Sequence, residues 1–156
     1  MPEGNRRRAP ADAAQAREEP GSAGSYVPRD AAEARARVAR ALETAVAGTG
    51  GRPSPTAVGD ALLVTSELVS NALRHGGGLT GFDVESDGDA VTITVADASD
   101  ELPHPADGRG RKRDAGPRGP GEGGFGWPLI GLLASEIRIR RLPGGGKAIE
   151  VRLPLH

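Results

Sequence analysis

Glycine and proline divide this chain into segments that can and cannot form a packed core. The 156 residues include 24 glycines and 13 prolines, close to the fraction at which a whole chain is expected to be disordered. These residues are unevenly spread, since seven fall in residues 1–28 and nine in residues 98–122. The remaining segments have ordinary globular composition. We therefore expect a disordered tail over residues 1–28 and a single small domain over residues 29–156.

Charge, cysteine content and hydropathy exclude several classes of protein. Lys and Arg total 20 against 21 Asp and Glu, a balance that argues against a nucleic-acid partner. The absence of cysteine excludes disulfide scaffolds, thiolate metal sites and cysteine nucleophiles. The longest apolar stretch, residues 129–134, is far shorter than the ~20 residues of a membrane helix, and residues 9–25 offer no apolar core of a signal peptide. We expect a cytoplasmic protein with no membrane partner.

Apolar periodicity predicts two helices followed by a hairpin. Apolar residues recur at helical spacing from Ala31 to Ala45 and again from Val58 to Ala72, and glycines 76–78 end the second pattern. Strand-like alternation follows over residues 79–86 and 90–97 on either side of an Asp-Gly-Asp turn. The first half of the domain is therefore predicted to be two helices and two antiparallel strands.

The second half begins with a long segment, residues 98–122, that holds one large apolar residue. Structureless loops of this length are usually functional lids or disorder. A short helix is predicted around residues 127–133, with Pro128 suited to its first turn, and a second hairpin over residues 136–142 and 147–155. This order predicts an α+β fold: a two-layer sandwich with a mostly antiparallel sheet and helices on one face.

The second helix carries polar residues that suit metal or nucleophile chemistry. Glu67, Asn71 and His75 are spaced four residues apart, which stacks them on one helix face. A carboxylate and a carboxamide one turn apart can hold a hydrated magnesium ion or position a nucleophile beside it. A solvated helix face is the alternative, with His75 favoured by the helix dipole.

Two further segments suit a ligand. Asp97 ends an apolar strand, where its carboxylate can accept a hydrogen bond from a ligand's amino group; a turn-forming Asp assisted by Ser99 is the alternative. Residues 121–126 bring a glycine-rich backbone to a helix N-terminus, where free amides and the helix dipole suit phosphate. A flexible linker is the alternative for this segment.

Taken in order, these segments resemble the conserved boxes of the gyrase, histidine kinase and MutL ATPase superfamily. Residues 67–76 resemble its N-box, residues 97–99 with Pro103 its G1 box, and residues 124–130 its G2 box. Within the superfamily, residues 30–155 resemble the small single-domain branch that includes anti-sigma-factor serine kinases. The ordered set of three boxes is much more specific than any one of them.

This resemblance implies a Bergerat-type fold that binds ATP and Mg²⁺ between the second helix, the sheet and a lid formed by residues 98–122. By family likeness, Glu67 is the catalytic general base, Asn71 coordinates the metal, and Asp97 binds the adenine amino group. The cofactor-binding residues implied by the resemblance lie in all three boxes; they are Asn71, Asp97, Ser99, Gly124, Gly126 and Leu129.

The resemblance also implies a function and partners. It suggests an ATP-dependent serine/threonine kinase that phosphorylates an anti-sigma-factor antagonist or holds a sigma factor, and it leaves a homodimer open. The alternative is a non-catalytic, ATP-dependent module that sequesters a regulatory protein. The sequence departs from the family at Ala148, where a threonine usually supports the adenine-binding aspartate, and at Ser99, which replaces a glycine.

Overall fold

The structure, a computed structural model, describes residues 26–49, 51–103 and 126–156. Residues 104–125, which include Gly124 and most of the expected lid, lie outside the described residues, as do residues 1–25. The helices and strands follow in the order α1 (Ala31–Thr49), α2 (Pro55–His75), β1 (Leu79–Ser86), β2 (Ala90–Asp97), α3 (Gly126–Leu133), β3 (Glu136–Arg141) and β4 (Lys147–Pro154).

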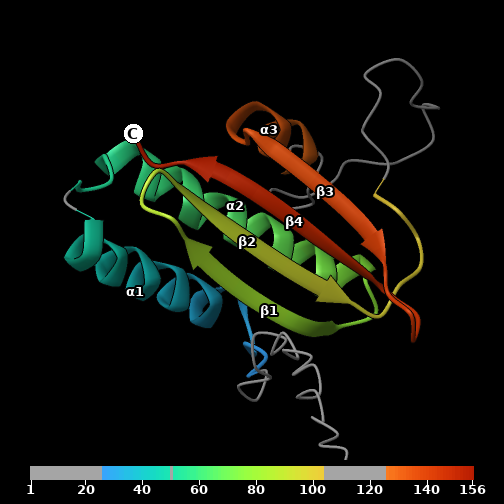
Figure 1. The fold of residues 1–156 in the computed structure, drawn as a ribbon. Helices are drawn as coiled ribbons and strands as arrows, with labels where there is room; N and C mark the ends of the chain where they lie inside the picture. The colour runs from blue at the N-terminus through green and yellow to red at the C-terminus, as the bar shows by residue number, and fades with distance from the viewer. Residues whose placement is uncertain (1–25, 50, 104–125) are drawn as a thin grey trace, which may run out of the picture.

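The four strands of the described residues form one antiparallel sheet in the order β1-β2-β4-β3 (Figure 1). The hairpins β1-β2 and β3-β4 are joined by pairing between β2 and β4, which runs from Ala90 opposite Pro154 to Asp97 opposite Lys147. Helix α2 lies behind the sheet in Figure 1, α1 lies beside α2 and β1, and α3 lies near one end of the sheet. This arrangement confirms the predicted α+β fold of Bergerat type.

One apolar core fills the space between α2 and the sheet. Leu68 and Val69 of α2 are buried against the two central strands. The large buried apolar residues of β2 and β4 alternate along each strand; they are Val91, Ile93, Val95, Ile149, Val151 and Leu153. Alternate residues of a strand face the same side. Asp97, two residues after Val95, and Lys147, two residues before Ile149, therefore lie on the helix side of the sheet.

The end of α2 is tied to the end of β2. The backbone N–H groups of Gly76 and Gly78 both donate to the carbonyl of Ala72, at 3.0 and 3.2 Å. The N–H of Ala98 then donates to the carbonyl of Gly78 at 3.3 Å. These bonds hold together the two segments that carry the candidate residues of the N-box and the G1 box.

Residues 26–28, which the sequence analysis assigned to the tail, pack on α1. The hydroxyl of Tyr26 donates to Glu33, and the guanidinium of Arg37 donates to the carbonyl of Tyr26. The Arg37 guanidinium also lies 5.2 Å from the centre of the Phe82 ring, which connects α1 to β1. None of the helices in the described residues is long and apolar enough to cross a membrane.

Candidate functional site

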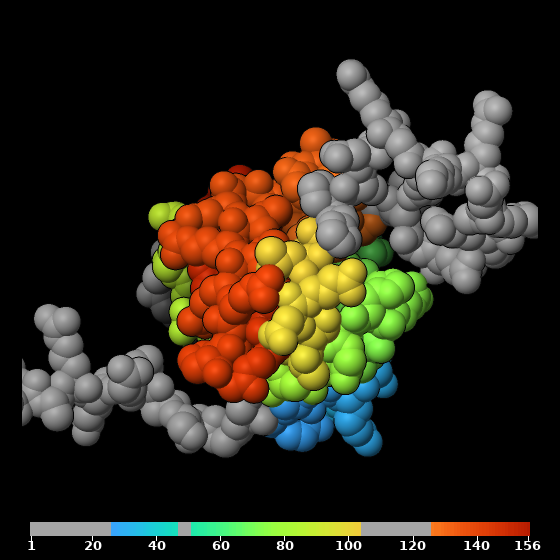
Figure 2. Space-filling view, turned by 90° about the vertical axis from the view of Figure 1, so that its right-hand side faces the viewer, coloured from blue at the N-terminus to red at the C-terminus, as the bar shows by residue number. Residues whose placement is uncertain are grey.

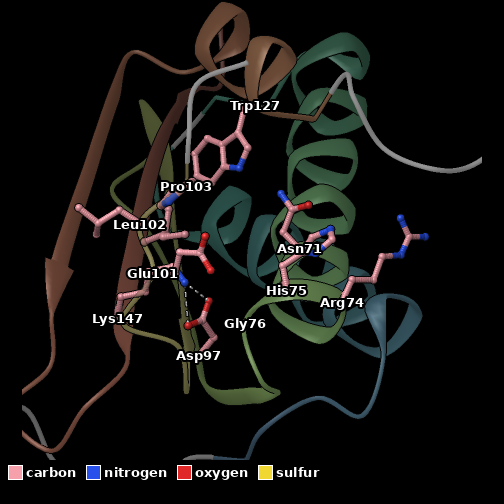
Figure 3. Close-up of a pocket in the computed structure, with 11 residues that line it drawn as sticks. Asn71, Arg74, His75, Gly76, Asp97, Glu101, Leu102, Pro103, Trp127 and Lys147 are labelled. Atoms are coloured by element: carbon pink, nitrogen blue, oxygen red, sulfur yellow. Dashed lines mark hydrogen bonds and ion pairs between the residues drawn. The ribbon is translucent and has the colours of Figure 1, made fainter. Parts of the chain in front are cut away.

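A cavity of about 580 Å³ opens between the ends of α2 and β2 and the start of α3 (Figure 3). Asn71 and His75 line it from α2, Asp97 from β2, Trp127 from α3 and Lys147 from β4. Figure 2 shows the segment that follows β2, in yellow, at the surface between the green region around the end of α2 and the orange hairpin. The volume is typical of a small-molecule site.

Asp97 lies at the inner end of the cavity and is only 4% exposed. Its Oδ1 accepts a hydrogen bond from the backbone N–H of Ser99 at 3.0 Å. A Cβ atom on Gly76 would lie 2.5 Å from Oδ2 of Asp97. The carboxylate can therefore occupy this position only because residue 76 has no side chain.

Lys147 shares the inner end of the cavity with Asp97. Its Nζ lies 3.0 Å from Oδ1 and 2.9 Å from Oδ2 of Asp97, and 3.4 Å from the carbonyl oxygen of Ser99. Both side chains are buried, and dashed lines join them in Figure 3. No role was predicted for Lys147 from the sequence, although a lysine and an aspartate at positions that continue the alternating buried pattern of two strands signal such an ion pair.

The position beside Asp97 is held by Lys147, so the sequence interpretation, which placed Ala148 where a threonine usually supports the aspartate, is wrong by one residue. The register of β2 and β4 places Ala148 opposite Ala96, and Lys147 opposite Asp97. Since neighbouring residues on a strand point to opposite sides, the side chain of Ala148 lies on the other face of the sheet. Lys147 occupies the position beside the carboxylate.

The turn before β4 fits closely around the end of β2. Gly146 has a φ of +83°, and a Cβ there would lie 2.1 Å from the carbonyl oxygen of Asp97. Its N–H donates to Oδ1 of Asp100 at 2.8 Å. Residue 146 must therefore be glycine, and this constraint fixes the start of β4 and the position of Lys147.

Asn71 has a polar atom that the described residues leave unsatisfied. Its Nδ2 is buried and has no hydrogen-bond partner among them. A buried amide group without a partner costs free energy, so the site suits a polar ligand at this point. The two ends of a carboxamide have nearly the same shape, and the same side chain can present either a donor or an acceptor there.

Glu67 lies one turn before Asn71 and does not line the cavity. Its carboxylate instead lies against the start of α3, where a Cβ on Gly126 would be 2.5 Å from Oε2. This contact places an acidic group beside a helix N-terminus, where the helix dipole favours a negative charge.

A comparison with protein-family models matches residues 27–153 to the histidine kinase-like ATPase domain. The chain belongs to this family. Histidine kinase-like ATPase domains bind ATP, so the superfamily predicted from the three boxes is confirmed and ATP is a ligand of the protein. A search of curated protein sequences found no match.

The structure of this histidine kinase-like ATPase brings together candidate residues from two boxes. Asn71 and Asp97 line the same cavity, and Ser99 contacts Asp97 and Lys147 through its backbone. Glu67 lies beside the cavity rather than in its lining. The i, i+4 spacing on α2 and the tie between α2 and β2 explain why the N-box and G1 residues meet.

The G2-box residues contribute differently from the sequence expectation. Gly126 is the first residue of α3 and contacts Glu67, whereas Leu129 is half-buried and is not among the residues that line the cavity. Gly124 lies outside the described residues. Trp127, which lies between Gly126 and Leu129 in the sequence, lines the cavity of this histidine kinase-like ATPase.

Proposed function

We propose that the cavity holds ATP with Mg²⁺ and that the protein transfers the γ-phosphoryl group to a serine or threonine hydroxyl of a regulatory protein. The observation that carries this proposal is that Asn71 and Asp97 line one cavity. Glu67 lies one turn before Asn71 on α2, and its carboxylate lies against the first residue of α3. Phosphoryl transfer depends mainly on positioning and electrostatic stabilisation, so a small set of protein groups can suffice.

Asp97 and Asn71 bind opposite ends of the nucleotide in this proposal. The carboxylate of Asp97, held by the N–H of Ser99, accepts a hydrogen bond from the adenine amino group. Asn71 would hold Mg²⁺ with phosphate oxygens and water, because no cluster of three His, Asp or Glu in the described part of the chain could hold a metal ion. Bound Mg²⁺ supplies neutralisation of the phosphate charge.

Glu67 is the proposed general base. As the hydroxyl oxygen of the partner bonds to the γ-phosphorus, the bond from that phosphorus to the β–γ bridging oxygen breaks. The bonding electron pair leaves with ADP, and the hydroxyl proton moves to a carboxylate oxygen of Glu67. The contact between Glu67 and Gly126 keeps the carboxylate at the start of α3, beside the G2 box.

The proposed partner is a cytoplasmic regulator of transcription. The sequence resemblance to the anti-sigma-factor branch supports an anti-sigma-factor antagonist as the phosphate acceptor, with a sigma factor as a second partner. A non-catalytic module that binds ATP and sequesters such a partner is the second candidate function. The Lys147–Asp97 ion pair favours it, because Lys147 competes with an adenine amino group for the carboxylate of Asp97.

A phosphotransfer assay tests the kinase proposal. Wild type, Glu67→Gln and Asn71→Ala are mixed with Mg²⁺, radiolabelled ATP and purified candidate antagonists. Glu67→Gln should bind ATP within a few-fold of wild type and lose ~100-fold or more of the transfer rate, since it removes only the base. Asn71→Ala should weaken Mg²⁺-dependent ATP binding and transfer together.

The exposed Glu43 of α1 provides a matched control, because Glu43→Gln removes a carboxylate far from the cavity lining and should change neither quantity. Wild-type turnover in Glu67→Gln would exclude Glu67 as the base. A wild type that binds ATP and a partner but labels no candidate would favour the binding module.

A further inference from the structure

The ammonium group of Lys147 is directed at the carboxylate of Asp97. A lysine side chain has three N–H donors. Its Nζ lies within hydrogen-bonding distance of three acceptors, the Oδ1 and Oδ2 atoms of Asp97 at 3.0 and 2.9 Å and the carbonyl oxygen of Ser99 at 3.4 Å. Lys147 is therefore committed to the same carboxylate that we propose for the adenine contact.

The surroundings keep this pair together. The side chains of Lys147 and Asp97 are 6% and 5% exposed, so neither charge can be solvated by leaving the other. Gly76 lies against Oδ2 of Asp97, and Gly146 fixes the backbone before Lys147. The pair nevertheless lines the cavity, so a bound base would meet both groups at once.

The pair presents a different hydrogen-bonding surface from a lone carboxylate. A free carboxylate accepts strong, charge-assisted hydrogen bonds, and its charge is balanced here by Lys147. Among the described residues, Oδ2 is paired only with Lys147, whereas Oδ1 also accepts from the N–H of Ser99, and Asp97 lines the cavity. A ligand amino group at Oδ2 competes with the ammonium, and a ligand carbonyl there can accept from it.

We propose that Lys147 determines the base selectivity of the site: it weakens the contact to the 6-amino group of adenine and lets the site accept 6-oxo purine nucleotides with similar affinity. This inference rests on the proposed role of Asp97 as the purine contact and extends it. A site with Asp97 and no lysine would bind 6-amino purines and reject 6-oxo purines, which place an acceptor against a carboxylate.

Nucleotide titrations without metal test the proposal independently of Asn71 and Mg²⁺. ADP and IDP differ at the 6-position of the base, and the fluorescence of Trp127 reports binding because this cavity residue is the single tryptophan of the chain. Wild type should bind ADP and IDP within about threefold of each other. Lys147→Thr should bind ADP about tenfold more tightly and IDP no more tightly, since only the amino group gains a charged acceptor.

Three further variants separate selectivity from folding. Lys147→Arg keeps a cation beside Asp97 and should keep the wild-type ratio of the two dissociation constants. Asp97→Asn combined with Lys147→Thr removes both charges and should lose the preference for ADP that Lys147→Thr gains. If Lys147→Thr does not fold, as judged by circular dichroism, Lys147→Gln keeps a neutral donor and should give an intermediate ratio.

The possible outcomes separate a failure of the proposed selectivity of Lys147 from a failure of the proposed nucleotide site. If wild type already prefers ADP to IDP by more than about tenfold and Lys147→Thr leaves that ratio unchanged, Lys147 does not determine selectivity and the Asp97 contact stands. If neither wild type nor Lys147→Thr binds either nucleotide, the proposed nucleotide site itself is wrong. Binding of ADP by Lys147→Thr together with no binding of either nucleotide by wild type would overturn the proposal, because the site would then not accept 6-oxo purine nucleotides.

Discussion

At the residue scale, the close contact between Gly76 and Asp97 gives a sharp prediction. A Cβ on residue 76 would lie 2.5 Å from Oδ2 of Asp97 and 2.7 Å from the carbonyl oxygen of Ala72. Neither atom can retreat, because Asp97 is held by Lys147 and the Ala72 oxygen belongs to the helix backbone. We expect Gly76→Ala to lower the free energy of unfolding by ~2 kcal/mol and to weaken ATP binding, measured by urea unfolding and by titration.

The chain offers a matched control for this substitution. Gly59 lies inside α2, and a Cβ there would meet no atom within 4 Å. Gly59→Ala should therefore stabilise the protein by ~0.5–1 kcal/mol, because alanine loses less backbone entropy in a helix. Wild-type stability and affinity in Gly76→Ala would show that the packing around Asp97 is looser than described.

Sequence reasoning found some residues of the site and missed others for a physical reason. Asn71 and Asp97 were predicted because their positions within a helix and at a strand end are local properties of the sequence. Lys147 was missed because its role depends on the register between β2 and β4, and Asp97 lies 50 residues away along the chain. Ala148 was misassigned by one residue for the same reason, since a shift of one residue exchanges the faces of a strand.

At the scale of single elements, the start of α1 gives a prediction about pH. The backbone N–H of Arg29 and the hydroxyl of Tyr26 both donate to the carboxylate of Glu33, and these bonds lower its pKa from 4.5 to about 2. A carboxyl group with a lowered folded-state pKa stabilises the fold above its unfolded pKa, and that contribution is lost as pH falls through the folded value. The contacts of residues 26–29 with α1 should therefore weaken between about pH 4.5 and pH 2.

Nuclear magnetic resonance can follow this titration at the Glu33 side chain and at the Tyr26 ring. In Glu33→Gln the Tyr26 ring should show at neutral pH the chemical shifts that the wild type reaches only at low pH, when the contact with Glu33 is lost. These shifts should not change between pH 4.5 and pH 2. Glu43→Gln changes an exposed residue of the same helix and should leave the titration of Glu33 and the response of the Tyr26 ring as in the wild type. An ordinary carboxyl titration near pH 4.5 for Glu33 in the wild type would contradict the described contacts.

The elements themselves were largely predictable from the sequence. Strand residues 79–86 and 90–97 were predicted with the bounds that the structure has, because alternation and the Asp-Gly-Asp turn are local signals. The strand order β1-β2-β4-β3 was not predicted, since the pairing of β2 with β4 joins segments that no local pattern connects. The fold class followed from the order of elements, whereas the position of the cavity required this pairing.

At the scale of the whole molecule, ATP should stabilise the fold. A ligand bound only by the folded state contributes ~2.7 kcal/mol at 100 times its dissociation constant, which raises the melting temperature of a domain of this size by roughly 10 °C. Calorimetry with increasing Mg-ATP measures the effect. Asp97→Asn should show a smaller shift at equal ATP concentration, and an unchanged melting temperature in the wild type would contradict ATP binding at this site.

The pairing of β2 with β4 also has a kinetic consequence. Asp97 belongs to the first hairpin and Lys147 to the second, so neither hairpin alone contains the inner end of the cavity. Contacts between segments far apart along the chain are slow to form, because the intervening loop must close first. If the two hairpins meet after the folding transition state, bound ATP will slow unfolding and leave the folding rate unchanged, because the nucleotide recognises only the completed sheet.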